Sequence, residues 1–138
     1  MKTSCFILPT VFLLQILCCC LPLGGWGLAY EHDLVENYSV WAADVNEQAC
    51  IVKKEKSNSS SAGCVVPWMV FEYGWNDDFI IAKQHPVENK VDTTITNWYI
   101  IEVKNGNVHG PLTEKDFFDL RQSLKIPDKL SFTEIINP

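Results

Sequence analysis

The side chains that could carry out acid–base or metal chemistry are scattered along this sequence. The three histidines, His32, His85 and His109, have no ligand spacing such as H-x-x-x-H, so the sequence predicts no metal site. Glu72 and Asp78 flank a turn-like segment, where carboxylates usually serve the turn itself. The sequence contains no G-x-S-x-G nucleophile motif and no G-x-x-x-x-G-K phosphate loop. The pattern therefore favours a protein without catalytic residues, metal or cofactor.

Cysteine oxidation is the chemistry that the sequence does support. Four of the six cysteines lie before residue 21, which leaves only Cys50 and Cys64 in the rest of the chain. In an oxidising compartment this pair is expected to form a disulfide, because cytosolic reductants would keep the thiols free. Closing the serine-rich segment between them would contribute about 3 kcal/mol. The alternative is two buried, reduced thiols, and no C-x-x-C motif supports thiol redox catalysis.

The first 29 residues differ from the rest of the chain. Lys2 is the only charged residue before Glu31, and an almost wholly apolar run follows it. A basic start, an apolar run and small residues afterwards are typical of a secretory signal peptide. We therefore expect residues 1–29 to form a signal peptide and residues 30–138 a single globular domain. A retained membrane anchor is the alternative, because the apolar run approaches the roughly 20 residues that span a bilayer.

The end of the apolar run resembles the lipobox of bacterial lipoproteins. Leu17 stands three residues before Cys20, within the sequence Leu-Cys-Cys-Cys. In that family, the thiol after such a stretch receives a diacylglycerol and becomes the new N-terminus. The resemblance implies cleavage before Cys20 and a lipid anchor in the membrane. Cys18 and Cys19 are alternative acceptors, and cleavage after Gly27 or Ala29 would release the domain without a lipid.

Composition limits the classes of protein to which the chain can belong. The sequence has 138 residues, of which 47% are hydrophobic, and this content suits one small folded domain. The 17 acidic and 11 basic side chains give a formal charge of −6. An acidic chain is a poor nucleic-acid binder, because such binding relies on neutralising phosphates with Lys and Arg.

Most of the domain is expected to form β-strands. Alternation over Met69–Trp75 predicts one face with Met69 and the three aromatic residues, and the opposite face with Val70, Glu72 and Gly74. Trp98–Ile101 is apolar on both faces, which predicts a central strand that is covered on both sides. The other strands are predicted within Tyr38–Ala43, Ala49–Lys54, Phe79–Ala82, Asn107–His109 and Leu130–Ile135, with residues 85–97 as a long hairpin connection.

The one predicted helix runs from Thr113 to Leu124. Thr113 is a suitable N-cap, Phe117 belongs to the buried stripe, and Pro127 is expected to end the helix. Before it, Asn105–Gly106 predicts a hairpin turn, and Gly110–Pro111 is expected to turn the chain from sheet into helix.

The aromatic residues could serve either the core or a binding surface. Trp41 and Trp98 are expected in the core. Trp68 and Trp75 border turns, so a sugar-stacking or protein-binding face stays open for them.

The motif Trp98-Tyr99-Ile100-Ile101, followed by Gly110-Pro111-Leu112, resembles an uncharacterised family of short bacterial secreted proteins or lipoproteins. The segment Phe79–Gln84 before the motif and the capped helix after it support the resemblance, which covers roughly Tyr38–Ile135. The resemblance implies a bacterial envelope location and a shared fold. It assigns no activity and no functional residues, so the motif itself is interpreted as structural.

The sequence thus predicts an α+β fold, an antiparallel β-meander of about five or six strands with one C-terminal helix packed on it. The expected function is that of a non-enzymatic binding module of the bacterial envelope, lipid-anchored or secreted. Its partner would be an envelope protein or ligand and not a nucleic acid. The alternative is a small, hydrolase-like envelope enzyme with an unrecognised site.

Overall fold

The structure is a computed structural model that describes residues 30–45, 48–54 and 63–135. The expected signal peptide (residues 1–29), its lipid acceptor Cys20 and the serine-rich segment 57–61 lie outside the described residues. Within these residues the chain forms nine β-strands and one α-helix. No helix in this part of the chain is long and apolar enough to cross a membrane.

The strands form two antiparallel sheets. The four-stranded sheet has the order β1-β2-β3-β4, and its strands are β1 (Tyr30–Asp33), β2 (Tyr38–Ala42), β3 (Cys50–Lys53) and β4 (Cys64–Val66). The five-stranded sheet has the order β8-β7-β6-β5-β9, and its strands are β5 (Val70–Trp75), β6 (Phe79–Gln84), β7 (Asn97–Glu102), β8 (Asn107–Leu112) and β9 (Thr133–Glu134).

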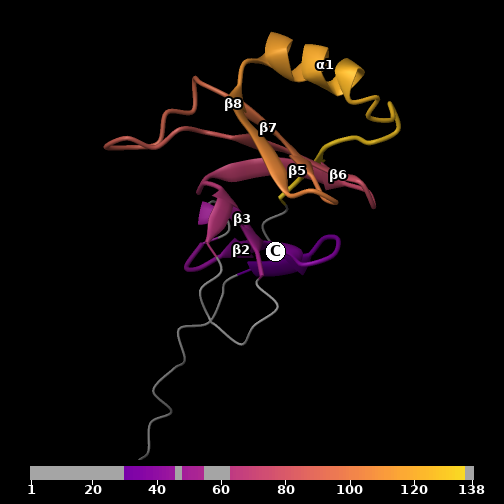
Figure 1. Cartoon of the computed structure of the whole chain (residues 1–138). Helices are drawn as coiled ribbons and strands as arrows, with labels where there is room; N and C mark the ends of the chain where they lie inside the picture. The colour runs from indigo at the N-terminus through magenta and orange to yellow at the C-terminus, as the bar shows by residue number, and fades with distance from the viewer. Residues whose placement is uncertain (1–29, 46–47, 55–62, 136–138) are drawn as a thin grey trace, which may run out of the picture.

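The molecule has three layers, with the five-stranded sheet between the four-stranded sheet and helix α1 (Glu114–Ser123) (Figure 1). Strand β7 contributes to both cores. Tyr99 and Ile101 pack toward the four-stranded sheet, whereas Trp98 and Ile100 pack toward Phe117 of α1. The predicted central strand, covered on both faces, is therefore confirmed.

The predicted α+β class is confirmed, but the strands are more numerous than expected and divide between two sheets. The meander of the five-stranded sheet, β5 to β8, follows the prediction, and β2 and β3 lie within their predicted ranges. Strands β1 and β4 are not among the predicted strands. Strand β1 reads Tyr-Glu-His-Asp and β4 has only three residues, so neither carries enough apolar alternation to be recognised.

The predicted alternation along β5 is interrupted by a bulge. Pairing with β6 shifts between Val70 and Glu72, so Phe71 is the extra residue. As a result, Val70 and Tyr73 both enter the core between the sheets, and the prediction that they occupy opposite faces is wrong. Met69 lies before the strand with φ 75°, which ends the regular pattern there.

Helix α1 begins as predicted but ends by a different device. The Thr113 side chain accepts a hydrogen bond from the Asp116 N–H, and Phe117 is fully buried. At the other end, Lys125 has φ 54°, and the N–H groups of Lys125 and Ile126 donate to carbonyls of the last turn. This is a Schellman motif, with lysine where glycine is usual. The helix therefore ends at its C-cap Leu124, as predicted, but the Schellman motif ends it before the chain reaches Pro127.

The Gly110–Pro111–Leu112 motif lies within β8 and does not turn the chain into the helix as expected. The pairing of β7 with β8 shifts by one residue opposite Tyr99, where Gly110 has φ 152°. A side chain on Gly110 would overlap the Tyr99 ring. Trp98 pairs with Leu112. The two halves of the motif are thus neighbouring strands that fit each other, which agrees with a structural role.

The tryptophans divide differently from the prediction. Trp98 is buried as expected. Trp41 is only half-buried, and its indole N–H donates to Glu31, so the prediction that it lies in the core is wrong. Trp75 packs partly against the core and stacks on Tyr73, whereas Trp68 is 45% exposed.

Candidate functional site

The side chains considered for acid–base or metal chemistry lie in separate places. His32 contacts the Tyr73 hydroxyl, His85 contacts the Ile95 carbonyl, and His109 contacts Glu102, so the histidines have different partners. No group of three or more His, Cys, Asp or Glu side chains in the described part of the chain could hold a metal.

The two carboxylates that flank the β5–β6 turn are each paired with a lysine. Glu72 forms an ion pair with Lys83 at 2.5 Å, and Asp78 forms one with Lys104 at 2.6 Å. They do not form a pair with each other that could share a proton. Their positions therefore give no support to acid–base catalysis by these two groups.

The two cysteines of the domain form a disulfide between β3 and β4. The Cα atoms of Cys50 and Cys64 are 5.8 Å apart, within the usual range for such a bond. The pairing matches the sequence prediction. From Cys64 the chain runs along β4 and reaches the exposed Trp68 before β5 begins, so the disulfide fixes the start of the segment that presents this indole.

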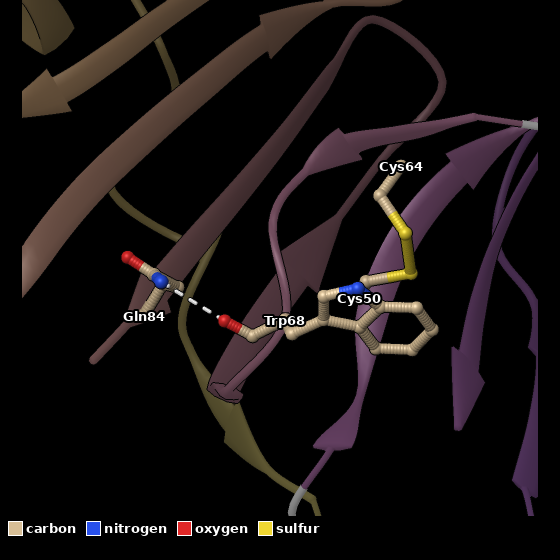
Figure 2. Close-up of a disulfide and its surroundings, with 4 residues drawn as sticks. All are labelled: Cys50, Cys64, Trp68 and Gln84. Carbon is tan, nitrogen blue, oxygen red and sulfur yellow. Dashed lines mark hydrogen bonds between the residues drawn. A yellow bond between two sulfur atoms is a disulfide. The ribbon is translucent and has the colours of Figure 1, made fainter. Parts of the chain in front are cut away.

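Gln84 holds Trp68 from the other side. Its side chain is 3% exposed, and its amide N–H donates to the Trp68 carbonyl at 2.9 Å. Its amide oxygen accepts from the Asn97 side chain at 3.0 Å. Figure 2 shows Gln84 on one side of the Trp68 backbone and the indole on the other, toward the disulfide. Gln84 thus joins the β4–β5 connection to the ends of β6 and β7.

The same end of the sheet carries the long loop of residues 85–96, which projects to the left in Figure 1. The His85 ring stacks on Phe71 at 4.1 Å, and one of its nitrogens lies 2.8 Å from the Ile95 carbonyl. Asp92 accepts from the Thr94 N–H and hydroxyl, which hold its pKa below the usual value. The loop therefore has a defined conformation.

Apolar side chains are unusually exposed around this loop. Trp68 is 45% exposed, and Val87 and Ile95 are each 49% exposed. The loop also encloses an open cleft of about 690 Å³, within the range of ligand sites. Its lining residues are Pro86, Glu88, Asn89, Lys90, Val91, Asp92, Thr93, Thr94 and Ile95. We call Trp68, Met69 and residues 85–96 the loop end of the sheet, and it is the candidate binding site.

The comparisons with known proteins identify the family. Residues 35–136 match the family described as a protein of unknown function, DUF3997. The chain belongs to this family. The expectation of an uncharacterised family is therefore confirmed, and the DUF3997 match begins just before β2 and ends just after β9. Searches of curated proteins and of solved structures found no match for the chain.

The sequence indicates Trp68 as a candidate for a binding face but does not place it in a site. In this DUF3997 chain, Gln84 lies just after the predicted strand Phe79–Ala82, and nothing local signals that its amide bridges to residue 68. Val87 and Ile95 lie within the predicted hairpin connection of residues 85–97. The only available signal was the aliphatic content of a long loop, because polar side chains usually predominate in such connections.

Proposed function

We propose that the chain is a non-enzymatic binding module of the bacterial cell envelope that engages its partner through the loop end. The observation that carries this proposal is Trp68, a large aromatic side chain that is nearly half exposed while its backbone is held by Gln84 and by the nearby disulfide. Tryptophan is enriched among the residues that dominate binding energy. A surface that is ordered before binding loses less conformational entropy when a partner arrives.

The envelope location is part of the proposal and rests on the sequence. The apolar leader with its lipobox-like end supports export, and a Cys50–Cys64 disulfide suits an oxidising compartment. Lipid attachment at Cys20 would hold the domain at the membrane surface, whereas cleavage after Ala29 would release it. Incorporation of a labelled fatty acid that is lost in Cys20→Ala would support the lipid-anchored form.

Site-specific photocrosslinking in the native envelope tests the binding surface. A photoreactive amino acid at residue 87 or 95 should give a discrete crosslinked species, and Trp68→Ala should abolish it. Val108→Ala is the control, because Val108 is 39% exposed on β8 and pairs with Ile101, at the opposite end of the sheet. The proposal is contradicted if crosslinking at residues 87 and 95 yields no discrete species, or if both alanine variants reduce it equally.

A further inference from the structure

Four polar side chains that line the cleft of the loop end are available to bind a ligand. Glu88, Asn89, Lys90 and Thr93 line the cleft, and among the described residues no hydrogen bond or ion pair engages their side chains. Their groups are a carboxylate, an amide, an ammonium and a hydroxyl. Together they offer several hydrogen-bond donors and several acceptors within one cleft.

The loop around these groups is held without their help. Asp92 N–H donates to the Pro86 carbonyl at 3.0 Å, and Val87 pairs with Val91 in an isolated bridge. Ile95 N–H donates to the Asp92 carbonyl at 3.4 Å. Compact surface loops of this length whose ends lie close together are often functional. The lining side chains are therefore available to a ligand while the backbone keeps its shape.

The walls of the cleft limit the chemical class of that ligand. Pro86, Val91 and Ile95 supply aliphatic surface between the polar groups. The charged lining residues are Glu88, Asp92 and Lys90, and the Asp92 carboxylate already accepts a hydrogen bond from the Thr94 hydroxyl. A phosphate would need an excess of cationic side chains, which this cleft lacks. A cationic ligand would need a clear excess of carboxylates, and the excess here is only one. A neutral molecule with both C–H faces and hydroxyl groups fits the cleft best.

We propose that this cleft binds a neutral oligosaccharide, an inference that rests on the proposed binding function of the loop end. The C–H faces of the sugar rings lie against the aliphatic walls, and their hydroxyl groups bond to Asn89, Thr93 and Glu88. The exposed indole of Trp68 lies outside this cleft, on the side of the Trp68 backbone that faces away from Gln84 (Figure 2). A cleft of about 690 Å³ has the size of a small-ligand site.

The test is an NMR titration of the ¹⁵N-labelled domain, from residue 30 onward with its disulfide intact, with maltotriose, cellotriose and fully N-acetylated chitotriose, which are all neutral. At least one of these trisaccharides should give saturable amide shifts confined to residues 85–96. Asn89→Ala and Thr93→Ala should each weaken that binding about fivefold, as expected for the loss of one neutral hydrogen bond. Gln122→Ala, which removes an exposed amide on α1, is the matched control and should leave binding unchanged.

Several outcomes would overturn the inference. Absence of shifts with all three trisaccharides up to about 10 mM would exclude a useful affinity. Shifts outside the loop end, or equal losses in Asn89→Ala and Gln122→Ala, would place the binding elsewhere. Shifts with the neutral peptide Ala-Asn-Ala but with none of the sugars would identify the wrong ligand class. In each case, the photocrosslinking result is read separately. A crosslink at residue 87 or 95 that depends on Trp68 would still support the proposed binding function, whereas its absence would contradict both that function and the oligosaccharide site.

Discussion

The polar side chains at the two ends of the five-stranded sheet differ in whether they have hydrogen-bond and ion-pair partners. At the turn end, formed by residues 76–78 and 102–107, the Asn76 side chain accepts two backbone N–H groups and Asp78 pairs with Lys104. Glu102 there accepts hydrogen bonds from Asn105 and Asn107 and contacts His109. At the loop end, most polar lining side chains have no such partners in the described structure.

This difference separates polar groups that serve the fold from polar groups that are available for binding. The turn end uses its carboxylates and amides to close two short turns, and those side chains have little capacity left for a ligand. The loop end is held by backbone bonds, by the buried Gln84 and by His85 stacking on Phe71. The side chains of Glu88, Asn89, Lys90 and Thr93, which make no such contacts in the described structure, are therefore not needed for folding.

The largest expected effect on stability concerns the core between the five-stranded sheet and α1. Phe117 is fully buried among Trp98, Ile100 and Ile81 in the middle layer, so Phe117→Ala should lower the free energy of unfolding by about 3–5 kcal/mol. Denaturant melts measure the loss, and hydrogen exchange should show that both ends are weakened together. Retained protection at one end only would mean that the two ends unfold independently.

The next effect concerns the disulfide, which lies nearer the loop end. Replacing both Cys50 and Cys64 by alanine should cost about 3 kcal/mol, because the unfolded chain regains the entropy of an open loop. Hydrogen exchange should accelerate around β4 and Trp68 before it does at residues 102–107. Reducing the parent protein with dithiothreitol is the control and should reproduce the loss. A neutral double variant would show that the bond does not fix Trp68.

A smaller effect tests the conformation of the β7–β8 turn. Gly106 has φ 76°, so Gly106→Ala should destabilise the protein by roughly 1–2 kcal/mol. Gly63→Ala is the matched control, because a Cβ there meets no atom within 4 Å and should change stability little. At the loop end, Asn89→Ala should stay within about 0.5 kcal/mol of the parent. Chemical denaturation of the three variants compares them, and a cost at residue 89 as large as at residue 106 would remove the distinction between the ends.

The last effect is the pH dependence of stability. The contact with His109, followed by the bonds from Asn105 and Asn107, lowers the pKa of Glu102 below its usual 4.5. A carboxyl whose pKa is lower in the folded state stabilises the protein above its unfolded pKa and loses that effect as the pH falls toward the folded value. Glu102→Gln should therefore flatten the decline of stability below pH 4.5.

Glu88→Gln, a matched substitution at the loop end, is the control for this pH effect. Its side chain has no hydrogen-bond or ion-pair partner in the described structure, so its neutralisation should leave the decline unchanged. Thermal melts between pH 3 and 7 compare the variants with the parent. An equal change in both would show that overall charge, and not the Glu102 network, sets the acid sensitivity.

The elements that the sequence predicted are those whose signals are local. Trp98–Ile101 is apolar at every position and Thr113 is a good cap, so β7 and α1 could be placed before any contact was known. The four-stranded sheet was harder, because its outer strands are short or polar.

The candidate site was hardest to predict, because it depends on pairing between distant segments. Trp68 and Gln84 meet only because β5 and β6 pair in the observed register, which brings Val70 opposite Gln84. The loop end is likewise visible only from exposure, since its valine and isoleucine would be read as core residues in any strand. Composition shows the aliphatic content of the loop, but it shows neither the contact between Trp68 and Gln84 nor the exposure of Val87 and Ile95.

The close fit of Gly110 to the Tyr99 ring has a consequence for how the chain folds. A strand that is apolar on both faces could pair one residue out of step and still bury only apolar side chains, so hydrophobicity does not distinguish the correct alignment of β7. Only one alignment brings the large ring opposite the residue that has no side chain. During folding, a misaligned pairing of β7 and β8 therefore places the Tyr99 ring against another side chain, and the two overlap. The correct alignment is favoured because only Gly110 leaves enough space for the ring.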